Sequence, residues 1–347
     1  MPRIRQGFLD CVIYLYPSVE GARQGVAFGG TGFLVAMKSE VHSDLDDFWH
    51  QYAVTNHHVV NDYGGAPVIR FNAAKGGTSE LELVKDDWLP HPDGDDLAVT
   101  YLGYRNGAAF KNTAVLLPHC ISSAVIDEHD IGPGDDVYTV GRFISHGGIQ
   151  HNEPCVRSGI ISMMPSEPIE DGRGHPQECF LIEIRALRGS SGSPVFVSIR
   201  PFSGRETRQM EQETDGDKLA QLRMASGTWL LGIAFADLPY KEEVMKKVVS
   251  EGVANEEPTD YVAYSNSGQT AVIPAWKIRD FILTDERFVM ARKMMDEKLE
   301  KIRKGSPLRP TAQKQEEPNE LTPEGFEDVL KKVFPKPSQP VSEKKET

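Results

Sequence analysis

Short runs of β-branched and aromatic residues, separated by glycine, proline and aspartate, recur along most of this chain. Clear examples are Val12–Tyr16, Val68–Phe71 and Asp136–Val140. Runs of this length, bounded by turn-forming residues, are typical of β-strands. The 31 glycines provide many positions for tight turns, and 347 residues suffice for one large β domain with additions. We therefore expect an all-β fold over most of the chain.

One turn has a composition that suits chemistry. Residues 189–194 read Gly-Ser-Ser-Gly-Ser-Pro and are followed by the apolar run Val195–Val197. A serine hydroxyl is a weak nucleophile, so it needs a neighbouring base and donors for the oxyanion. Glycine on each side permits the tight backbone that such donors require. Taken alone, the hexapeptide fits an ordinary turn between strands equally well.

A histidine and an acid occur upstream in suitable settings. Residues 52–60 read as a strand that ends in a polar turn with histidine, and residues 93–102 read as an acidic turn leading into a strand. The order along the chain is therefore His, Asp, Ser. These segments resemble the catalytic motifs of trypsin-like serine peptidases with the chymotrypsin fold, in particular the bacterial Deg (high-temperature-requirement) type. Further strands of similar sequence follow in the family's order over about residues 25–283.

The resemblance implies a role for each matching residue. His58 would be the general base, Asp96 would orient it and Ser191 would be the nucleophile. The backbone N–H groups of Gly189 and Ser191 would form the oxyanion hole. The resemblance also implies an extended substrate pairing with the strand at Ile233, Ala234 and Phe235. Arg185 falls near the base of the family's primary specificity pocket, which would suit an acidic or polar substrate side chain.

Each of these roles has a competitor nearby in the sequence. The alternatives are His57 for the base, Asp93 and Asp95 for the acid, and Ser190 and Ser193 for the nucleophile. Alignment with the family's motifs favours His58, Asp96 and Ser191 over these alternatives. Ser193 itself departs from the family, which commonly has glycine there. The nucleophile elbow of α/β-hydrolases is excluded, because its last glycine is missing and its triad runs Ser, Asp, His.

The resemblance implies a specific architecture. We expect two packed, six-stranded antiparallel barrels within residues 1–283, meeting at about residues 105–130. The implied activity is that of a serine endopeptidase acting through an acyl-enzyme on a protein or peptide substrate. The alternative is a catalytically silent binding module with the same fold. We expect no cofactor and no metal, because no zinc-type spacing, phosphate loop or dinucleotide motif is present.

Two polar insertions, residues 198–226 and 237–268, flank the second expected barrel. They are candidates for gating the cleft, and ordinary surface loops would explain them equally well. In the second insertion, Val244, Val248 and Val249 suit one face of a short helix.

After the barrels, apolar spacing predicts a helix over residues 275–304, with a break near Thr284 and a helical extension over 284–304. Residues 305–347 are rich in Pro, Lys, Glu and Gln and predict a disordered tail. Within it, residues 322–334 form a short amphipathic pattern that predicts a helix docking onto a regulatory partner or onto the chain itself.

The formal net charge is −13, and residues 285–347 hold 14 Lys/Arg and 13 Asp/Glu, so residues 1–284 carry −14. This acidity argues against a nucleic-acid partner. It would favour basic peptides, and solubility alone would also account for it. No stretch has the ~18 apolar residues that cross a bilayer, and no export signal is recognisable. We therefore expect a cytoplasmic protein with no membrane partner, whose four scattered cysteines are free thiols.

Overall fold

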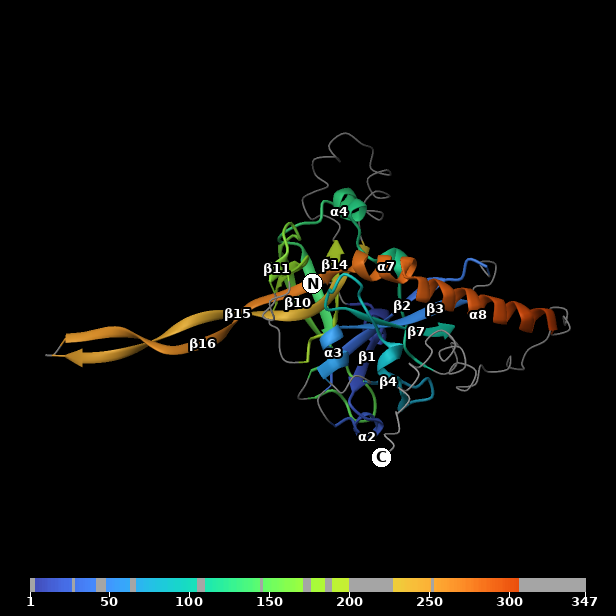
Figure 1. Ribbon diagram of the computed structural model, residues 1–347, viewed down its shortest axis with the longest axis horizontal. Helices are drawn as coiled ribbons and strands as arrows, with labels where there is room; N and C mark the ends of the chain where they lie inside the picture. Colours follow the sequence, from blue (N-terminus) through green and yellow to red (C-terminus); the bar gives the residue numbers. More distant parts are fainter. Residues whose placement is uncertain are drawn as a thin grey trace, which may run out of the picture.

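The computed structural model describes residues 4–26, 29–41, 48–62, 67–104, 110–143, 146–170, 176–184, 189–199, 227–250 and 253–305. Arg185, nearly all of the 198–226 insertion and the tail after residue 305, with its predicted helix 322–334, lie outside these ranges. The described chain is rich in β-structure and forms two β assemblies followed by two helices, as Figure 1 shows.

The first assembly is a sheet with the pairing order β5-β4-β1-β2-β3-β7-β6, to which β8 adds in parallel beside β2. Its strands are β1 (Val12–Tyr16), β2 (Thr31–Lys38), β3 (Trp49–Thr55), β4 (Val68–Asn72), β5 (Thr78–Leu81), β6 (Leu89–Pro90), β7 (Ala98–Tyr104) and β8 (Val115–Leu116). The short helices α1 (Gln6–Asp10), α2 (Val19–Gln24), α3 (His57–Asp62) and α4 (Ser123–His129) lie between or after them.

This first sheet differs from the closed six-stranded barrel that we expected. Its end strands β5 and β6 are not paired with each other in the part of the chain that the structure describes. β6 has only two residues, and β5 has four residues that are all incompletely buried. Strands this short offer few backbone groups for a further ladder, so the sheet remains open between them.

The second assembly is a closed antiparallel barrel in the order β10-β13-β16-β15-β14-β9. Its strands are β9 (Asp136–Gly141), β10 (Cys155–Met163), β13 (Phe180–Glu183), β14 (Pro194–Ile199), β15 (Gly227–Ser250) and β16 (Val253–Pro274). A small two-stranded sheet of β11 (Ile169–Glu170) and β12 (Pro176–Gln177) lies outside this barrel.

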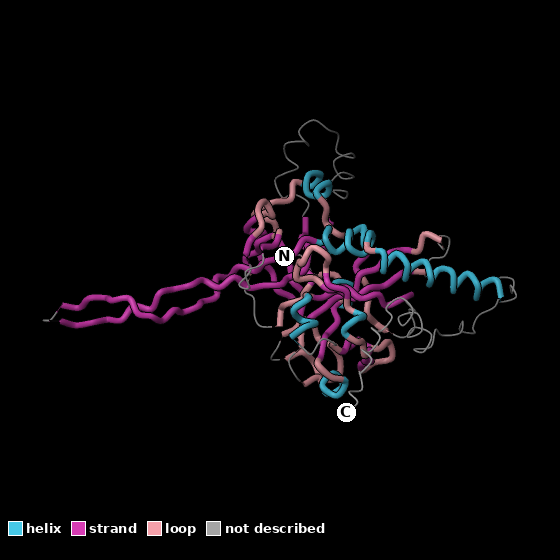
Figure 2. The backbone as a smooth tube through the Cα atoms, viewed as in Figure 1, coloured by secondary structure: helices cyan, strands magenta, loops and turns pink. Residues whose placement is uncertain are grey.

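β15 and β16 continue far beyond the barrel as a two-stranded ribbon. They stay paired from Gly232↔Pro274 to Ser250↔Val253, and the ribbon projects away from the body of the molecule (Figures 1 and 2). The prediction of a short helix around Val244, Val248 and Val249 is therefore wrong, because this segment is part of strand β15. Valine and tyrosine favour extended structure, and pairing with residues 253–265 settles the choice.

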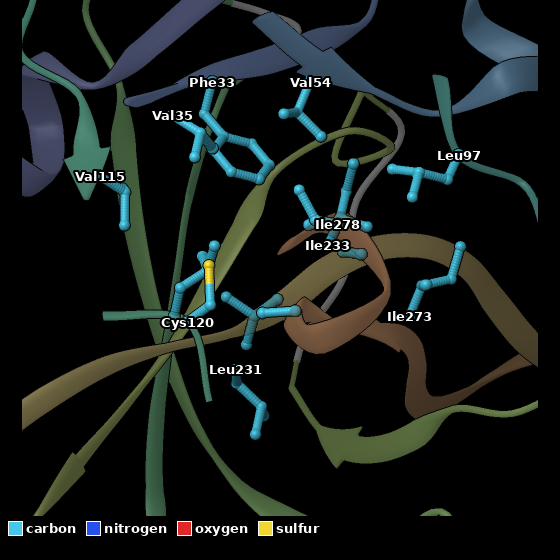
Figure 3. Packing of buried hydrophobic residues seen from close by; sticks show 14 of the residues in the cluster. Phe33, Val35, Val54, Leu97, Val115, Cys120, Leu231, Ile233, Ile273 and Ile278 are labelled. Atoms are coloured by element: carbon cyan, nitrogen blue, oxygen red, sulfur yellow. The ribbon is translucent and has the colours of Figure 1, made fainter. Parts of the chain in front are cut away.

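The two assemblies share one hydrophobic core. Figure 3 shows Phe33 and Val54 of the first sheet near Ile233 and Ile273 of the barrel, with Ile278 of the helix after β16 beside them. All five are almost completely buried. Burial of such apolar side chains is the main favourable contribution to folding. The two assemblies are therefore held in a fixed relation by common packing.

The opposite face of the first sheet has a core of its own. Alternate strand residues point to opposite faces, so Ile13 and Leu34 belong to a second cluster, whereas their neighbours Tyr14 and Phe33 belong to the shared one. Both faces of the central strands are thus covered, which is why all five residues of β1 are buried.

Two helices follow the barrel, with Asp285 between them. α7 (Ala275–Thr284) buries Ile278, Phe281 and Ile282 in the shared core. α8 (Glu286–Gly305) returns to the first sheet, where the rings of Phe288 and Tyr52 meet with centroids 5.5 Å apart.

Polar contacts fasten α8 to the same sheet. Asp296 accepts a 2.8 Å hydrogen bond from Ser39 Oγ and a further hydrogen bond from Tyr104, and it lies 3.4 Å from His50 Nε2. Arg292 donates to the hydroxyl of Tyr52 at 2.9 Å. The last described helix is thus anchored on strands from the beginning of the chain.

Candidate active site

His58 is fixed at the point where β3 leaves the sheet and α3 begins. Its neighbours Val59 and Val60 are buried in the core of the first sheet. A Cβ atom built on Gly30 would lie 2.3 Å from Val59 Cγ1, so the missing side chain at Gly30 allows α3 to approach β2 closely. This packing sets the position of His58 just beyond the end of β3.

Asp96 holds His58 through two hydrogen bonds. Its Oδ1 atom accepts from the backbone N–H of His58 at 2.7 Å, and its Oδ2 atom lies 2.5 Å from His58 Nδ1. The two side chains are only 13% and 12% exposed. Water therefore competes weakly for this contact, which fixes both the position and the ring orientation of the histidine.

The backbone of Asp96 is held as well. Its carbonyl oxygen accepts a 2.9 Å hydrogen bond from Asn56 Nδ2, and its N–H group donates to Gln177 Oε1 at 3.0 Å. Neither Asn56 nor Gln177 was predicted from the sequence as a site residue. Asn56 stands beside the histidine in the motif, whereas Gln177 comes from the distant β12 and has no motif of its own.

The turn that carries Ser191 depends on two glycines with positive φ, Gly189 at 91° and Gly192 at 85°. This is the conformation that side-chain-bearing residues rarely adopt. A Cβ atom on Gly192 would also lie 1.8 Å from the carbonyl oxygen of Thr31. Glycine is thus required at position 192 for both conformation and space.

Thr31, at the start of β2, ties this turn to the histidine-bearing strand. Its backbone N–H donates to Ser191 O at 3.1 Å, and its Oγ1 hydroxyl donates to Gly189 O at 2.9 Å. Its own carbonyl oxygen accepts from Thr55 Oγ1 at 2.8 Å, one residue before Asn56. Fully buried Thr31 therefore connects the serine turn of the barrel to the end of β3.

Ser193 fits into the turn because of the residue opposite. Its side chain is buried, and a Cβ atom built on Gly141, the last residue of β9, would lie 2.0 Å from Ser193 Oγ. Glycine at position 141 therefore leaves the space that the extra side chain at 193 occupies.

The backbone donors expected at the oxyanion hole have no acceptor within the described chain. The N–H groups of Gly189 and Ser191 make no hydrogen bond there, whereas Gly192 donates to Ala234 O and Ser193 donates to Ser190 O, each at 2.9 Å. The first two groups thus lack an acceptor within the described ranges.

The competing residues have other contacts. His57 Nε2 lies 3.0 Å from Asn61 Nδ2 on the same helix. The carboxylate of Asp95 binds Lys277, and Asp93 is exposed. The carbonyl oxygen of Ser190 closes the turn by accepting from Ser193.

The strand expected to bind substrate is partly occupied. Ala234 uses both backbone groups inside the molecule, donating to Ser193 O at 3.0 Å and accepting from Gly192. Ile233 pairs with Pro194 on one side and Ile273 on the other. Phe235 lies at a bulge between the pairs Ala234↔Val272 and Ala236↔Ala271, and from Ala236 onward the described residues pair β15 only with β16. Of the three predicted residues, only Phe235 thus has an unpaired strand edge beside it.

The cysteines contribute no nucleophile to the described site. All four are free, and Cys11, Cys120 and Cys179 are buried. Burial raises the pKa of the Cys179 thiol to about 11 and that of Cys120 to about 12, which keeps both protonated. Within the described ranges, no three His, Cys, Asp or Glu side chains form a possible metal site, and no helix has the length and apolar character needed to cross a membrane.

Part of this chain matches a known protein family. Residues 30–198 match the family described as trypsin-like peptidase domain. That range contains His58, Asp96 and Ser191. No curated protein matches the chain.

Several solved structures are similar in overall path. Deg5 has 16% sequence identity over 67% of this chain and 81% of its own, with a TM-score of 0.34. The HtrA-type protease AlgW with a decapeptide has 15% identity over 74% of this chain and 52% of its own, with a TM-score of 0.37. An inactive serine-to-alanine mutant of Rv3671c from M. tuberculosis H37Rv has 13% identity over 79% and 86%, with a TM-score of 0.37.

Proposed function

Because this chain carries a trypsin-like peptidase domain over residues 30–198, we propose that it is a serine endopeptidase that uses His58, Asp96 and Ser191. The double contact between Asp96 and His58 carries this proposal. A carboxylate only accepts hydrogen bonds, so the proton between the two side chains belongs to His58 Nδ1. In the neutral imidazole, the opposite nitrogen, Nε2, has a lone pair and can act as a base.

The reaction follows from these roles. Ser191 Oγ attacks the carbonyl carbon of the substrate while His58 Nε2 takes its proton. The tetrahedral intermediate collapses when His58 returns that proton to the leaving amine, and the substrate's acyl group remains on Ser191. Water, deprotonated by His58, then attacks the ester, and His58 returns this proton to Ser191 Oγ as the second product is released. Asp96 stays ionised throughout and stabilises the imidazolium that forms in each step.

The backbone donors of the serine turn would stabilise the intermediate. The N–H groups of Gly189 and Ser191 lack acceptors within the described chain, so they can donate to the developing oxyanion. One such donor typically contributes about 2.7–4 kcal/mol of barrier stabilisation. The positive φ of Gly189 is part of the turn that presents them.

A peptide substrate would add to the barrel as a further strand. The edge available for this begins at Phe235, because Ile233 and Ala234 are already paired on both sides. Binding by main-chain hydrogen bonds suits protein substrates of varied sequence. It also places the substrate backbone next to the Gly189–Ser193 turn, which bonds to Ala234.

Covalent labelling with a fluorophosphonate probe tests the proposal. The native chain should label at one site, Ser191→Ala should not label, and Ser190→Ala should label as the native chain does. Mass spectrometry of peptides cleaved from an unfolded protein should then report internal cleavage sites. If the native chain neither labels nor cleaves, the proposal fails and a catalytically silent binding module is the remaining function.

A further inference from the structure

The loop that carries Asp96 is closed by its own backbone. The N–H group of His91 donates to Leu97 O at 2.9 Å, and Leu97 donates to Asp95 O at 2.6 Å. Gly94 donates back to His91 O at 3.1 Å and has a φ of 84°. These hydrogen bonds hold the loop in one conformation, so a displacement of Asp95 would also displace Asp96.

The carboxylate of Asp95 contacts Lys277 and His91 rather than His58. Lys277 Nζ lies 2.9 Å from both oxygens of its carboxylate, and His91 Nδ1 lies 3.0 Å from Oδ2. The side chain of Asp95 is 6% exposed and that of Lys277 is 18% exposed. Glu178 Oε2 approaches the same ammonium group at 3.6 Å from the barrel side.

The titration of Asp95 agrees with this geometry. Burial by itself would raise the pKa of this carboxyl group, but the nearby His91 ring and the hydrogen-bonded ammonium group of Lys277 outweigh burial and hold the pKa below its ordinary value. Asp95 is thus ionised and engaged at neutral pH.

Lys277 belongs to a rigid part of the molecule. It lies on α7, next to Ile278, and α7 is fixed in the shared core through Phe281 and Ile282. The loop is held at a second point by Gln177 of β12, which accepts from the N–H of Asp96. Two contacts, one from α7 and one from β12, thus hold a loop that lies between β6 and β7 of the first sheet.

We propose that Asp95 and Lys277 are positioning residues that hold the loop of Asp96 in the position in which the Asp96 carboxylate orients His58. This inference rests on the proposed function. A buried ion pair is by itself weak evidence for stability, because desolvation offsets much of its attraction. The effect of this pair here is on geometry. Lys277 binds both carboxylate oxygens of Asp95, so it restrains the orientation of the residue next to the proposed acid, Asp96.

The first test measures the labelling of Ser191 by the fluorophosphonate in the full chain. Lys277→Met should reduce the maximal labelling rate about tenfold or more, with the probe concentration for half-maximal rate unchanged. Lys277→Arg, which keeps the charge, should restore most of that rate. Asp296→Asn is the matched control, because it removes a partly buried carboxylate that fastens α8 to Ser39 and Tyr104 rather than to the Asp96 loop, and it should label at the native rate.

A double variant separates positioning from stability. Asp95→Asn with Lys277→Met leaves no unpaired buried charge, so its melting temperature should recover relative to Lys277→Met alone. The proposal requires that its labelling rate stays low. If the rate recovers together with the melting temperature, the pair is only structural and the proposal is overturned.

A second measurement does not depend on catalysis. The proton between His58 Nδ1 and Asp96 should give a far-downfield proton NMR resonance that His58→Ala removes. This resonance should be lost or shifted in Lys277→Met and kept in Asp296→Asn. If it is unchanged in Lys277→Met, the positioning role is refuted. If the native chain shows it but fails to label, the proposed function fails instead.

Discussion

The contact between Gly141 and Ser193 gives a sharp test of how the serine turn is packed. In Gly141→Ala, the new methyl group would lie 2.0 Å from Ser193 Oγ and 3.0 Å from Ser193 Cβ. The next nearest atom, Thr31 Oγ1, is at 3.7 Å, which is ordinary contact. A single side chain therefore causes the whole conflict. Rotation of the Ser193 hydroxyl can relieve the shorter contact, whereas the 3.0 Å contact with Ser193 Cβ requires a shift of the backbone near Ser191.

The cost of such overpacking is typically about 1–3 kcal/mol. For a protein of this size, about 2 kcal/mol lowers the melting temperature by roughly 3 °C. Ser193→Gly should cost only about 0.5–1 kcal/mol, the usual entropic cost of glycine. Its Oγ atom has no hydrogen-bond partner within the described residues, so no hydrogen bond is lost there.

Thermal unfolding of the four proteins in this cycle measures the coupling. Gly141→Ala should be much less destabilising when Ser193→Gly is present, with a coupling energy of about 1–2 kcal/mol. Ser193→Ala should rescue only in part, because its Cβ atom still lies 3.0 Å from the new methyl group. Fluorophosphonate labelling of Ser191 should follow the same order. Equal destabilisation in both backgrounds would refute the reasoning.

Three further results are expected. Thr31→Val keeps the shape of the side chain but leaves the part-buried Gly189 carbonyl without its donor. This should cost about 1–3 kcal/mol and slow labelling of Ser191, whereas an unchanged rate would deny Thr31 a role in the turn. The pKa of Asp95 is lowered in the folded protein. The stability that its ionised form contributes is therefore complete above its unfolded pKa of about 3.9 and is lost as the pH falls through its folded pKa. The difference in melting temperature between the native protein and Asp95→Asn should shrink below about pH 4, and a constant difference would contradict this. Replacing residues 240–265 of the ribbon by a short turn should leave the melting temperature nearly unchanged, because its strands pair only with each other there; a large decrease would mean that the ribbon supports the barrel.

The strands were predictable where the information is local. Val12–Tyr16 is β1 as expected, and the runs beginning at Val68 and Asp136 open β4 and β9. Each is a compact β-branched or aromatic run between turn residues, so its composition alone favours a strand. The spacing of glycine and proline around Ser191 likewise predicted a tight turn, which the positive φ of Gly189 and Gly192 confirms.

The ribbon was missed because its sequence suits two structures. Val244, Val248 and Val249 have helical spacing, yet they are also β-branched. Pairing with a segment later in the chain decides between the two, and no local pattern contains that partner. The open edge of the first sheet was missed for a related reason, since closure depends on the lengths of β5 and β6 rather than on their composition.

The supporting residues of the candidate site were unpredictable for a simpler reason. Gln177 bonds to Asp96 across 81 residues, and Lys277 bonds to Asp95 across 182 residues. A glutamine at a short strand and a lysine on a helix are usually solvated surface residues. Only the fold brings them to the acid loop, so motif spacing gives no indication of them.

The anchoring of α8 on the first sheet has a consequence for the order of events during synthesis. Asp296 follows its partners Tyr104 and Ser39 by 192 and 257 residues. At about 5–20 residues per second, that separation corresponds to roughly 10–50 seconds of translation. Throughout this interval, the face of the sheet that α8 covers, including Tyr52, remains uncovered. Nascent chains are therefore most exposed to chaperones and to mispairing before α8 emerges.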